Sequence, residues 1–199
     1  MANEILAPTV YFSQTGEENT TRTLDLARIR MEALGIRTVV AATTSGETGV
    51  LAARMLKDFE VIIVSHSTGF SDPNLQEISV ENRQAIEAAG ATILTCQHAL
   101  GGVNRAIRRT YQTYQTDEII ANTLRLFGQG IKVCIEMSLM ASDAGLVRTD
   151  QPVMFIAGSG SGADTAVVLK PANAHKFFEV NVLEIVCRPS PHHPAFENA

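Results

Sequence analysis

The sequence predicts an α/β fold built on a mostly parallel sheet. Short apolar or β-branched segments alternate with segments of helical periodicity, which is the order of elements in α/β proteins. Residues 61–64 form a continuous apolar run without alternation, which is typical of a strand covered by helices on both faces. With 199 residues and 45% hydrophobic content, the chain is expected to form a single domain over residues 1–199.

The N-terminal half is expected to contain three strands separated by two helices. A short apolar strand is predicted at 9–12, and the helix after it carries an apolar stripe that stops at Gly35, a residue type that commonly ends helices. β-branched residues predict the second strand over 38–41. A helical pattern over 49–57 then leads to the buried strand at 61–64.

The C-terminal half continues the alternation. A helix is predicted over 80–89, and helical patterns follow at about 117–127 and 131–144. The last of these is apolar around most of its circumference and is therefore expected to be buried. Apolar, β-branched runs predict further strands at 92–95, 153–157, 166–169 and 183–187. Three prolines predict an irregular tail from about residue 189.

Polar turns follow five of the predicted strands. In a parallel sheet the carboxyl ends of the strands share one edge, and ligands of such folds bind at that edge. The sequence therefore predicts a binding site formed jointly by the turns at 13–20, 43–48, 65–70, 97–102 and 158–165.

One turn has the composition of an anion-binding loop. It consists of Thr43, Thr44, Ser45, Gly46, Glu47 and Thr48. A turn rich in hydroxyls and glycine between a strand and a helix offers backbone N–H groups and the positive helix end to a phosphate or carboxylate. Thr44 followed by Glu47 also matches a capping box, which would close the helix without any ligand, and Thr15 with Glu18 forms a second candidate box.

A glycine-rich segment precedes the strand at 166–169. Its residues Gly158, Ser159, Gly160, Ser161, Gly162 and Ala163 match the letters of a dinucleotide-binding fingerprint, which requires a helix next. The β-branched residues from Thr165 onward predict a strand instead, so this fingerprint is rejected. Two interpretations stay open: glycines that let the backbone approach a ligand closely, or a glycine-rich hairpin turn.

Two histidines follow predicted strands and could meet above the sheet. His66 or His98, together with Asp164 or Glu47, could transfer protons, although a histidine that only shapes its loop is the alternative. Spacing supplies no third ligand, so no metal site is predicted. The sequence assigns no catalytic residue.

Composition excludes several classes of protein. A net charge of −5 and 6% aromatic content without Trp argue against a nucleic-acid-binding protein, and no apolar segment is long enough to predict a membrane span. Cys96, Cys134 and Cys187 are expected to be buried free thiols, and no signal peptide is evident, so a cytoplasmic protein is expected. A basic cluster with helical spacing could be a solvated helix face, a contact in a homo-oligomer or an anion clamp: Arg105, Arg108 and Arg109.

Together these motifs resemble those of a known family. The loop at 43–48 resembles the phosphate-binding loop of the pyruvate kinase C-terminal domain, and 160–162 resembles the second loop of its effector site. From about residue 7 to 189 the chain is similar to small stand-alone proteins of this fold from archaea and bacteria. The matching segments are 16–20, 40–48, 98–100, 132–134, 144–146 and 162–166.

The resemblance implies a three-layer α/β/α domain and an association with flavin mononucleotide (FMN). It implies an FMN-binding protein, with a flavoenzyme of unknown substrate as one form of this hypothesis and a non-enzymatic sensor of a phosphorylated metabolite as the alternative. Without room for the barrel domain of pyruvate kinase, phosphoryl transfer from phosphoenolpyruvate is not expected. The candidate cofactor-binding residues are Thr43, Thr44, Ser45, Gly46, Glu47, Thr48, His66, Gly69, His98, Gly158, Ser159, Gly160, Gly162, Asp164 and Thr165.

Glu47 departs from the family pattern, because many pyruvate kinases have a basic or neutral residue there. A carboxylate in the site would repel a phosphate. The capping box predicts that Glu47 turns back to the helix backbone, which would be compatible with phosphate binding.

Overall fold

The computed structural model describes residues 4–197, which form one seven-stranded sheet in the order β1-β7-β6-β5-β2-β3-β4. β6 runs antiparallel to both of its neighbours, and the other neighbouring strands pair in parallel. The strands are β1 (Val10–Phe12), β2 (Thr38–Thr43), β3 (Glu60–Ser65), β4 (Thr92–Thr95), β5 (Val153–Ala157), β6 (Thr165–Lys170) and β7 (Asn181–Pro189). The predicted, mostly parallel sheet is confirmed.

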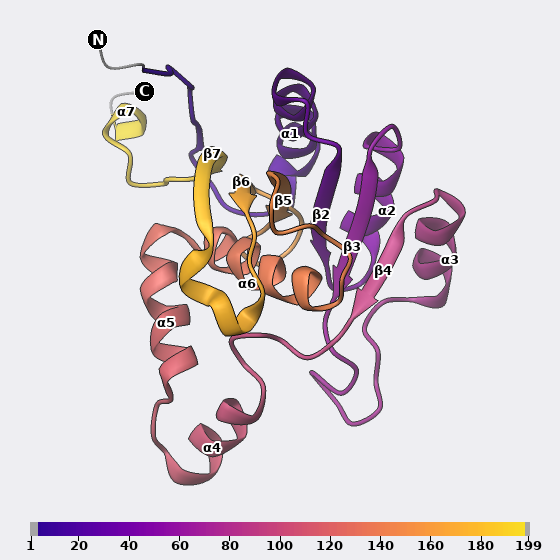
Figure 1. Cartoon of the computed structure of the whole chain (residues 1–199), viewed down its shortest axis with the longest axis vertical. Coiled ribbons are helices and arrows are strands. Elements are labelled where there is room, and N and C mark those ends of the chain that lie inside the picture. Colours follow the sequence, from indigo (N-terminus) through magenta and orange to yellow (C-terminus); the bar gives the residue numbers. More distant parts are fainter. Residues whose placement is uncertain (1–3, 198–199) are drawn as a thin grey trace.

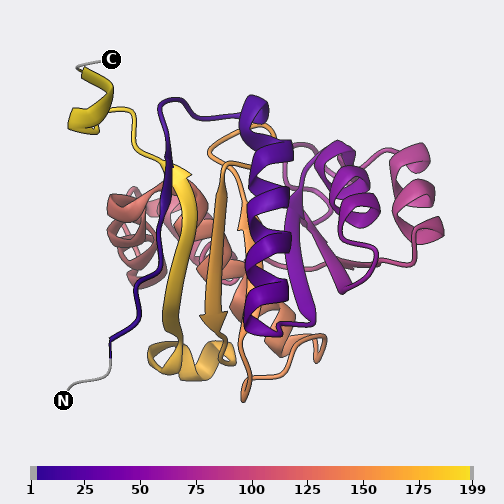
Figure 2. The same cartoon turned by 90° about the horizontal axis from the view of Figure 1, so that it is seen from above.

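Helices cover both faces of the sheet. The first three α-helices lie on one face and α6 lies on the other, so the layers are α/β/α as the resemblance implied (Figures 1 and 2). The α-helices are α1 (Thr20–Leu34), α2 (Glu47–Met55), α3 (Val80–Ala88), α4 (Val103–Tyr111), α5 (Thr116–Leu124), α6 (Gln129–Asp143) and α7 (Pro194–Glu197). Short 3-10 helices are η1 (Glu17–Asn19), η2 (Arg125–Phe127) and η3 (Ala174–Glu179).

Alternate residues of the central strands supply two hydrophobic cores. On β5, Met154 and Ile156 pack toward α1–α3, whereas Phe155 packs toward α6, and all three are fully buried. Since each buried aliphatic or aromatic side chain contributes about 1.5–3 kcal/mol relative to an exposed one, a strand buried on both faces favours an apolar residue at every position. This accounts for the continuous apolar runs in the sequence.

Helix α6 is buried, as its apolar sequence predicted. Twelve of its residues are buried, including Lys132 and Glu136. At its first turn Gly130 passes so close to β6 that a β-carbon would lie 2.2 Å from the Thr165 hydroxyl oxygen. A glycine at this position therefore lets the helix lie directly on the sheet.

Neither predicted capping box forms. Thr43 ends β2, and its hydroxyl accepts hydrogen bonds from the N–H groups of Gly46 and Gly49 at 3.1 and 3.3 Å. Because the strand continues two residues beyond its predicted end, Thr43 makes the capping contacts that were predicted for Thr44. No side chain caps α1, which begins at Thr20 after η1, so the predicted box at Thr15 is also wrong.

The C-terminal tail differs from its prediction. β7 extends to Pro189 beside β1, and residues 194–197 form the short helix α7, so the tail is not irregular throughout. Proline is compatible with both, because it can end a strand and also suits the first turn of a helix.

In the described part of the chain, no helix is both long and apolar enough to cross a membrane.

Candidate functional site

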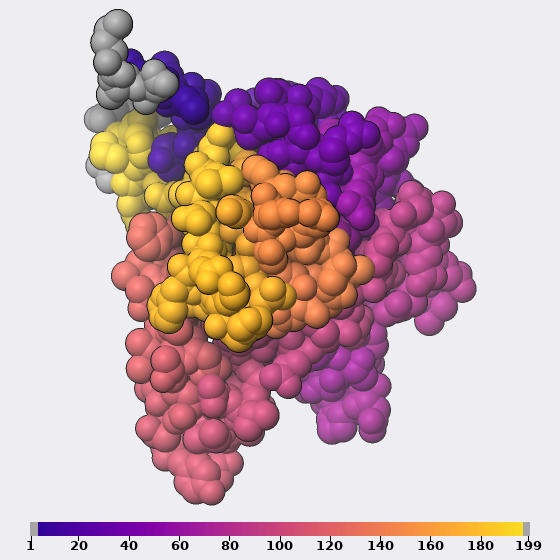
Figure 3. Space-filling view, viewed as in Figure 1, coloured from indigo at the N-terminus to yellow at the C-terminus, as the bar shows by residue number. Residues whose placement is uncertain are grey.

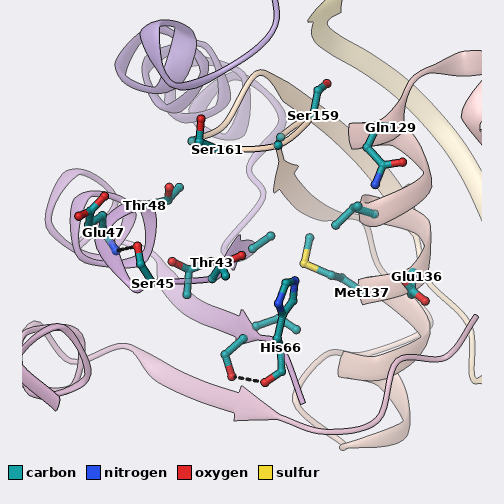
Figure 4. Close-up of a pocket in the computed structure, with 18 of the residues that line it drawn as sticks. Thr43, Ser45, Glu47, Thr48, His66, Gln129, Glu136, Met137, Ser159 and Ser161 are labelled. Atoms are coloured by element: carbon teal, nitrogen blue, oxygen red, sulfur yellow. Dashed lines mark hydrogen bonds between the residues drawn. The ribbon is translucent and has the colours of Figure 1, made fainter. Parts of the chain in front are cut away.

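A cavity of about 830 Å³ opens at the carboxyl edge of the parallel strands (Figure 4). Each of the five predicted turns contributes lining residues, so their shared position is confirmed. The turns meet because β1 to β5 run in the same direction, as their pairing with β7 and β6 and with one another requires. One side of the cavity is formed by the loop before α2 and the opposite side by α6.

The loop between β2 and α2 forms the polar end of the cavity. Thr43, Thr44, Ser45, Glu47 and Thr48 line it. The Ser45 hydroxyl accepts a long hydrogen bond from the N–H of Glu47, at 3.5 Å. Within residues 4–197 the N–H of Thr48 has no acceptor, so the first turn of α2 keeps a free donor beside the cavity.

Gly46 and Glu47 take different places from those predicted. Gly46 is buried behind the loop with φ +103°, a backbone conformation that favours glycine, and does not line the cavity. Glu47 makes no capping contact: its carboxylate is exposed at the rim, directed away from His66 (Figure 4). The predicted turn of Glu47 toward the helix backbone is therefore wrong, because Gly46 is the N-cap, Glu47 is only the first helical residue, and Thr43 already accepts the N–H of Gly46.

The glycine-rich segment is the hairpin loop between β5 and β6, and it also lines the cavity. Gly158, Ser159, Gly160, Ser161 and Gly162 all contribute. A β-carbon on Gly158 would lie 2.3 Å from the carbonyl oxygen of Gly162, so the hairpin closes only with glycine there. The hairpin-turn interpretation is therefore confirmed. The loop lines the cavity, and the close approach of its backbone to a ligand stays a prediction.

Asp164 and Thr165 support this loop from below and do not line the cavity. The fully buried Asp164 carboxylate accepts hydrogen bonds from the N–H groups of Gly16 and Ser159, each at 3.1 Å, and from the Thr165 hydroxyl at 2.8 Å. Asp164 thus fixes the glycine loop to the turn after β1. Its predicted role in proton transfer with a histidine does not fit this geometry.

The two predicted histidines do meet. The rings of His66 and His98 are 5.3 Å apart, and the ring of Phe70 lies against both, at 4.2 and 4.9 Å. The partner of His66 is neither Asp164 nor Glu47 but Glu77, whose carboxylate lies 2.7 Å from Nδ1. Burial lowers the pKa of His98, the positive charges of Lys132 and Arg105 and the nearby His66 lower it further, and Glu136 opposes them. Gly69 lies in the same turn but outside the cavity wall.

The wall formed by α6 contains site residues that sequence reasoning missed. Gln129, Lys132 and Glu136 line the cavity together with the apolar Val133, Met137 and Met140. The ammonium group of Lys132 pairs with Glu136, whose other oxygen accepts the N–H of Leu100 at 2.8 Å. The available signal was polar side chains recurring every three or four residues on a helix that is otherwise apolar.

The cavity therefore combines a donor-rich end, an apolar wall and ionisable groups. Hydroxyl and N–H donors at α2 face Met137 across the cavity, and His66 projects into the space between them (Figure 4). Such a site suits a ligand with an anionic group at one end and an apolar body. Among the described residues, no group of three metal-ligating side chains is present.

Comparison with known proteins gives one family match. The model of a family described as "Pyruvate kinase, alpha/beta domain" matches residues 21–169. Among solved structures, the chain aligns with a hydrogen sulfide-producing enzyme (Fn1220) from Fusobacterium nucleatum, with 20% identity and a TM-score of 0.30. That alignment covers 53% of this chain and 39% of the enzyme. A TM-score this low indicates neither a shared fold nor a shared function.

Proposed function

The chain belongs to the pyruvate kinase alpha/beta domain family, and from this premise we propose that its cavity binds a small phosphate-bearing molecule, with FMN as the expected ligand. The observation that carries the proposal is the loop before α2, which presents hydroxyl groups and the free N–H of Thr48 to the cavity. A phosphate there would lie at the positive end of the helix dipole.

The cavity meets the size and polarity requirements of such a ligand. Its volume of about 830 Å³ lies within the range of about 300–1,000 Å³ of small-molecule sites. Ser45, Thr48 and the N–H of Thr48 would hold the phosphate, and Val64, Met137 and Met140 would pack against an apolar ring system. Bound FMN would supply hydride or electron transfer, and His66, which lines the cavity, would exchange a proton with a substrate.

The alternative, a sensor of a phosphorylated metabolite, shares the α2 loop but requires no ring system. Arg105 in the cavity wall pairs with no carboxylate among the described residues, and it favours a polar, anionic ligand body. The two hypotheses differ in one measurable respect. A flavin site binds FMN more tightly than phosphorylated molecules without the flavin ring. A metabolite sensor binds sugar phosphates and does not bind flavin.

The first experiment is an FMN titration of the purified protein, followed by flavin absorbance after desalting and by thermal unfolding. Retention of one FMN per chain with a raised Tm is expected, because a ligand of the folded state alone stabilises it. Riboflavin, which lacks the phosphate, is expected to bind more weakly. Sugar phosphates that raise the Tm when FMN does not would favour the sensor instead.

The phosphate assignment is tested with Ser45→Asp. A carboxylate about 4 Å from a phosphate costs about 1 kcal/mol even in water, which corresponds to at least about fivefold weaker FMN binding. Gln84→Glu adds the same charge at an exposed position of α3 outside the cavity and is the matched control. Equal FMN affinity of the Ser45→Asp and control proteins would show that the phosphate does not bind at this loop.

A further inference from the structure

A second pocket adjoins the cavity. It has a volume of about 330 Å³ and lies between α4 and α5. Arg105 and Arg125 line both the pocket and the cavity, so the two spaces meet at these side chains. The α4–α5 segment and the loop after β3 both project from the molecule, and a notch separates them in the space-filling view (Figures 1 and 3).

The pocket carries uncompensated positive charge. Four guanidinium groups line it, and Glu118 is the one carboxylate among the described residues that do so: the arginines are Arg105, Arg108, Arg109 and Arg125. Glu118 pairs with Arg108 at 2.5 Å. Arg125 donates only to the neutral side chains of Gln129 and Asn122, at 2.8 and 2.7 Å. Within residues 4–197, no carboxylate pairs with Arg105 or Arg109.

Arg105 makes a cation–π contact with an aromatic ring. Its guanidinium lies 5.1 Å from the ring centre of Phe70, the ring that also lies against His66 and His98. It also passes Gly101 so closely that a β-carbon there would lie 2.5 Å from Nη2. This cation–π contact restricts the position of the guanidinium before any ligand arrives. Its N–H groups make no ion pair among the described residues and are left for an acceptor.

We propose that this arginine pocket is a second oxyanion site, continuous with the cavity, which binds a second phosphate or a carboxylate of the ligand. Guanidinium groups match both anions geometrically through paired N–H···O bonds. The ligand would then carry an anionic group at each end, one at α2 and one at the arginines. This extent of the ligand rests on the proposed function, whereas the oxyanion site itself can be tested separately.

The test is an NMR titration with inorganic phosphate at low ionic strength, following the arginine Nε–H signals. It uses the Ser45→Asp protein, in which the α2 loop is blocked. Saturable shifts of the Arg105 and Arg125 signals are expected. Arg105→Gln and, separately, the exposed Arg109→Gln, each added to Ser45→Asp, are expected to weaken this binding at least fivefold. Arg54→Gln, an exposed position on α2 outside both spaces, is the matched control.

Three results would overturn the proposal: no saturable shift of these signals, shifts unchanged by both arginine variants, or equal weakening by Arg54→Gln. Failure of the proposed function would give a different result. Wild type and Ser45→Asp would then both bind phosphate only at the arginines, with the same affinity. The same titration with acetate separates the two anions. Tighter phosphate binding assigns a phosphate to the pocket, and tighter acetate binding assigns a carboxylate.

Discussion

Asp164 joins chain segments that are far apart in the sequence. Its buried carboxylate receives the N–H groups of Gly16 and Ser159 and the hydroxyl of Thr165. Asp164→Ala leaves these donors without an acceptor, and each buried unsatisfied group costs about 1–3 kcal/mol. We expect a loss of about 3 kcal/mol or more in the free energy of unfolding, measured by urea denaturation. Asp164→Asn keeps one acceptor oxygen and is expected to lose less, and an equal loss would contradict this account.

His98 should make the stability of the protein depend on pH. Its folded-state pKa is lowered, mainly by burial, whereas in the unfolded chain it takes up a proton at the ordinary value of about 6.5. Between these two pKa values the unfolded state binds more protons, so the free energy of unfolding falls as the pH falls. His98→Gln is expected to lose less stability between about pH 7.5 and about pH 5.5, as measured by urea denaturation at both values. An identical pH dependence in both proteins would rule out this contribution.

Residues of the site differed in how well they could be predicted. Loop residues such as Ser45 and Ser159 were found because polar turns after parallel strands must share one edge. Glu77 was missed because it reaches His66 from eleven residues away within a loop, a distance that no strand or helix period encodes. Lys132 and Arg105 were missed as wall residues because a sequence pattern does not reveal which side of a helix faces a cavity.

Helix α6 contributes both a wall of the site and a buried ion pair. Lys132 and Glu136 are about 5% exposed, so removing one charge leaves the other uncompensated in the interior. Lys132→Met is expected to cost about 3–5 kcal/mol in the free energy of unfolding. Lys132→Met combined with Glu136→Gln is expected to recover most of this loss, because glutamine can still accept the N–H of Leu100.

The matched control for this pair lies in η3. Lys176 and Glu179 also form an ion pair, but both side chains are more than half exposed. Exposed pairs contribute about 0–1 kcal/mol, so Lys176→Met is expected to change the free energy of unfolding by less than about 1 kcal/mol. Thermal and urea denaturation of the three variants make the comparison. A double variant no more stable than Lys132→Met would show that the cost is not one of an unpaired charge.

Helices and strands were predicted best where burial requires apolar residues along most of the element. β3 and β5 are apolar at nearly every position because both faces are covered. α6 is apolar around most of its circumference, which correctly predicted a buried helix. The reversed direction of β6 and the strand order depend on which strands pair across long stretches of chain, and neither has a local sequence signal. The start of α2 was misplaced because Thr43 ends a strand and caps a helix at once.

At the scale of the whole molecule, one sheet separates two hydrophobic cores, and each contains a buried thiol. Cys134 lies in the core beneath α6, and Cys187 lies in the core beneath α1. Burial raises the pKa of Cys187 to about 11 and raises that of Cys134 well above its ordinary value. Because the thiolate is the reactive form, neither cysteine is expected to react in the folded protein near neutral pH.

These two thiols can report whether both layers unfold together. In a Cys96→Ser protein, which removes the half-buried third thiol, labelling with a thiol reagent requires the buried cysteines to become exposed. If the shared sheet makes the fold one cooperative unit, Cys134 and Cys187 are expected to react at the same rate, and denaturant should accelerate both equally. Peptide mass spectrometry after timed labelling measures the two rates. A faster reaction of Cys187 would mean that β7 and α1 detach before α6, and then the two faces of the sheet would be separate units of stability.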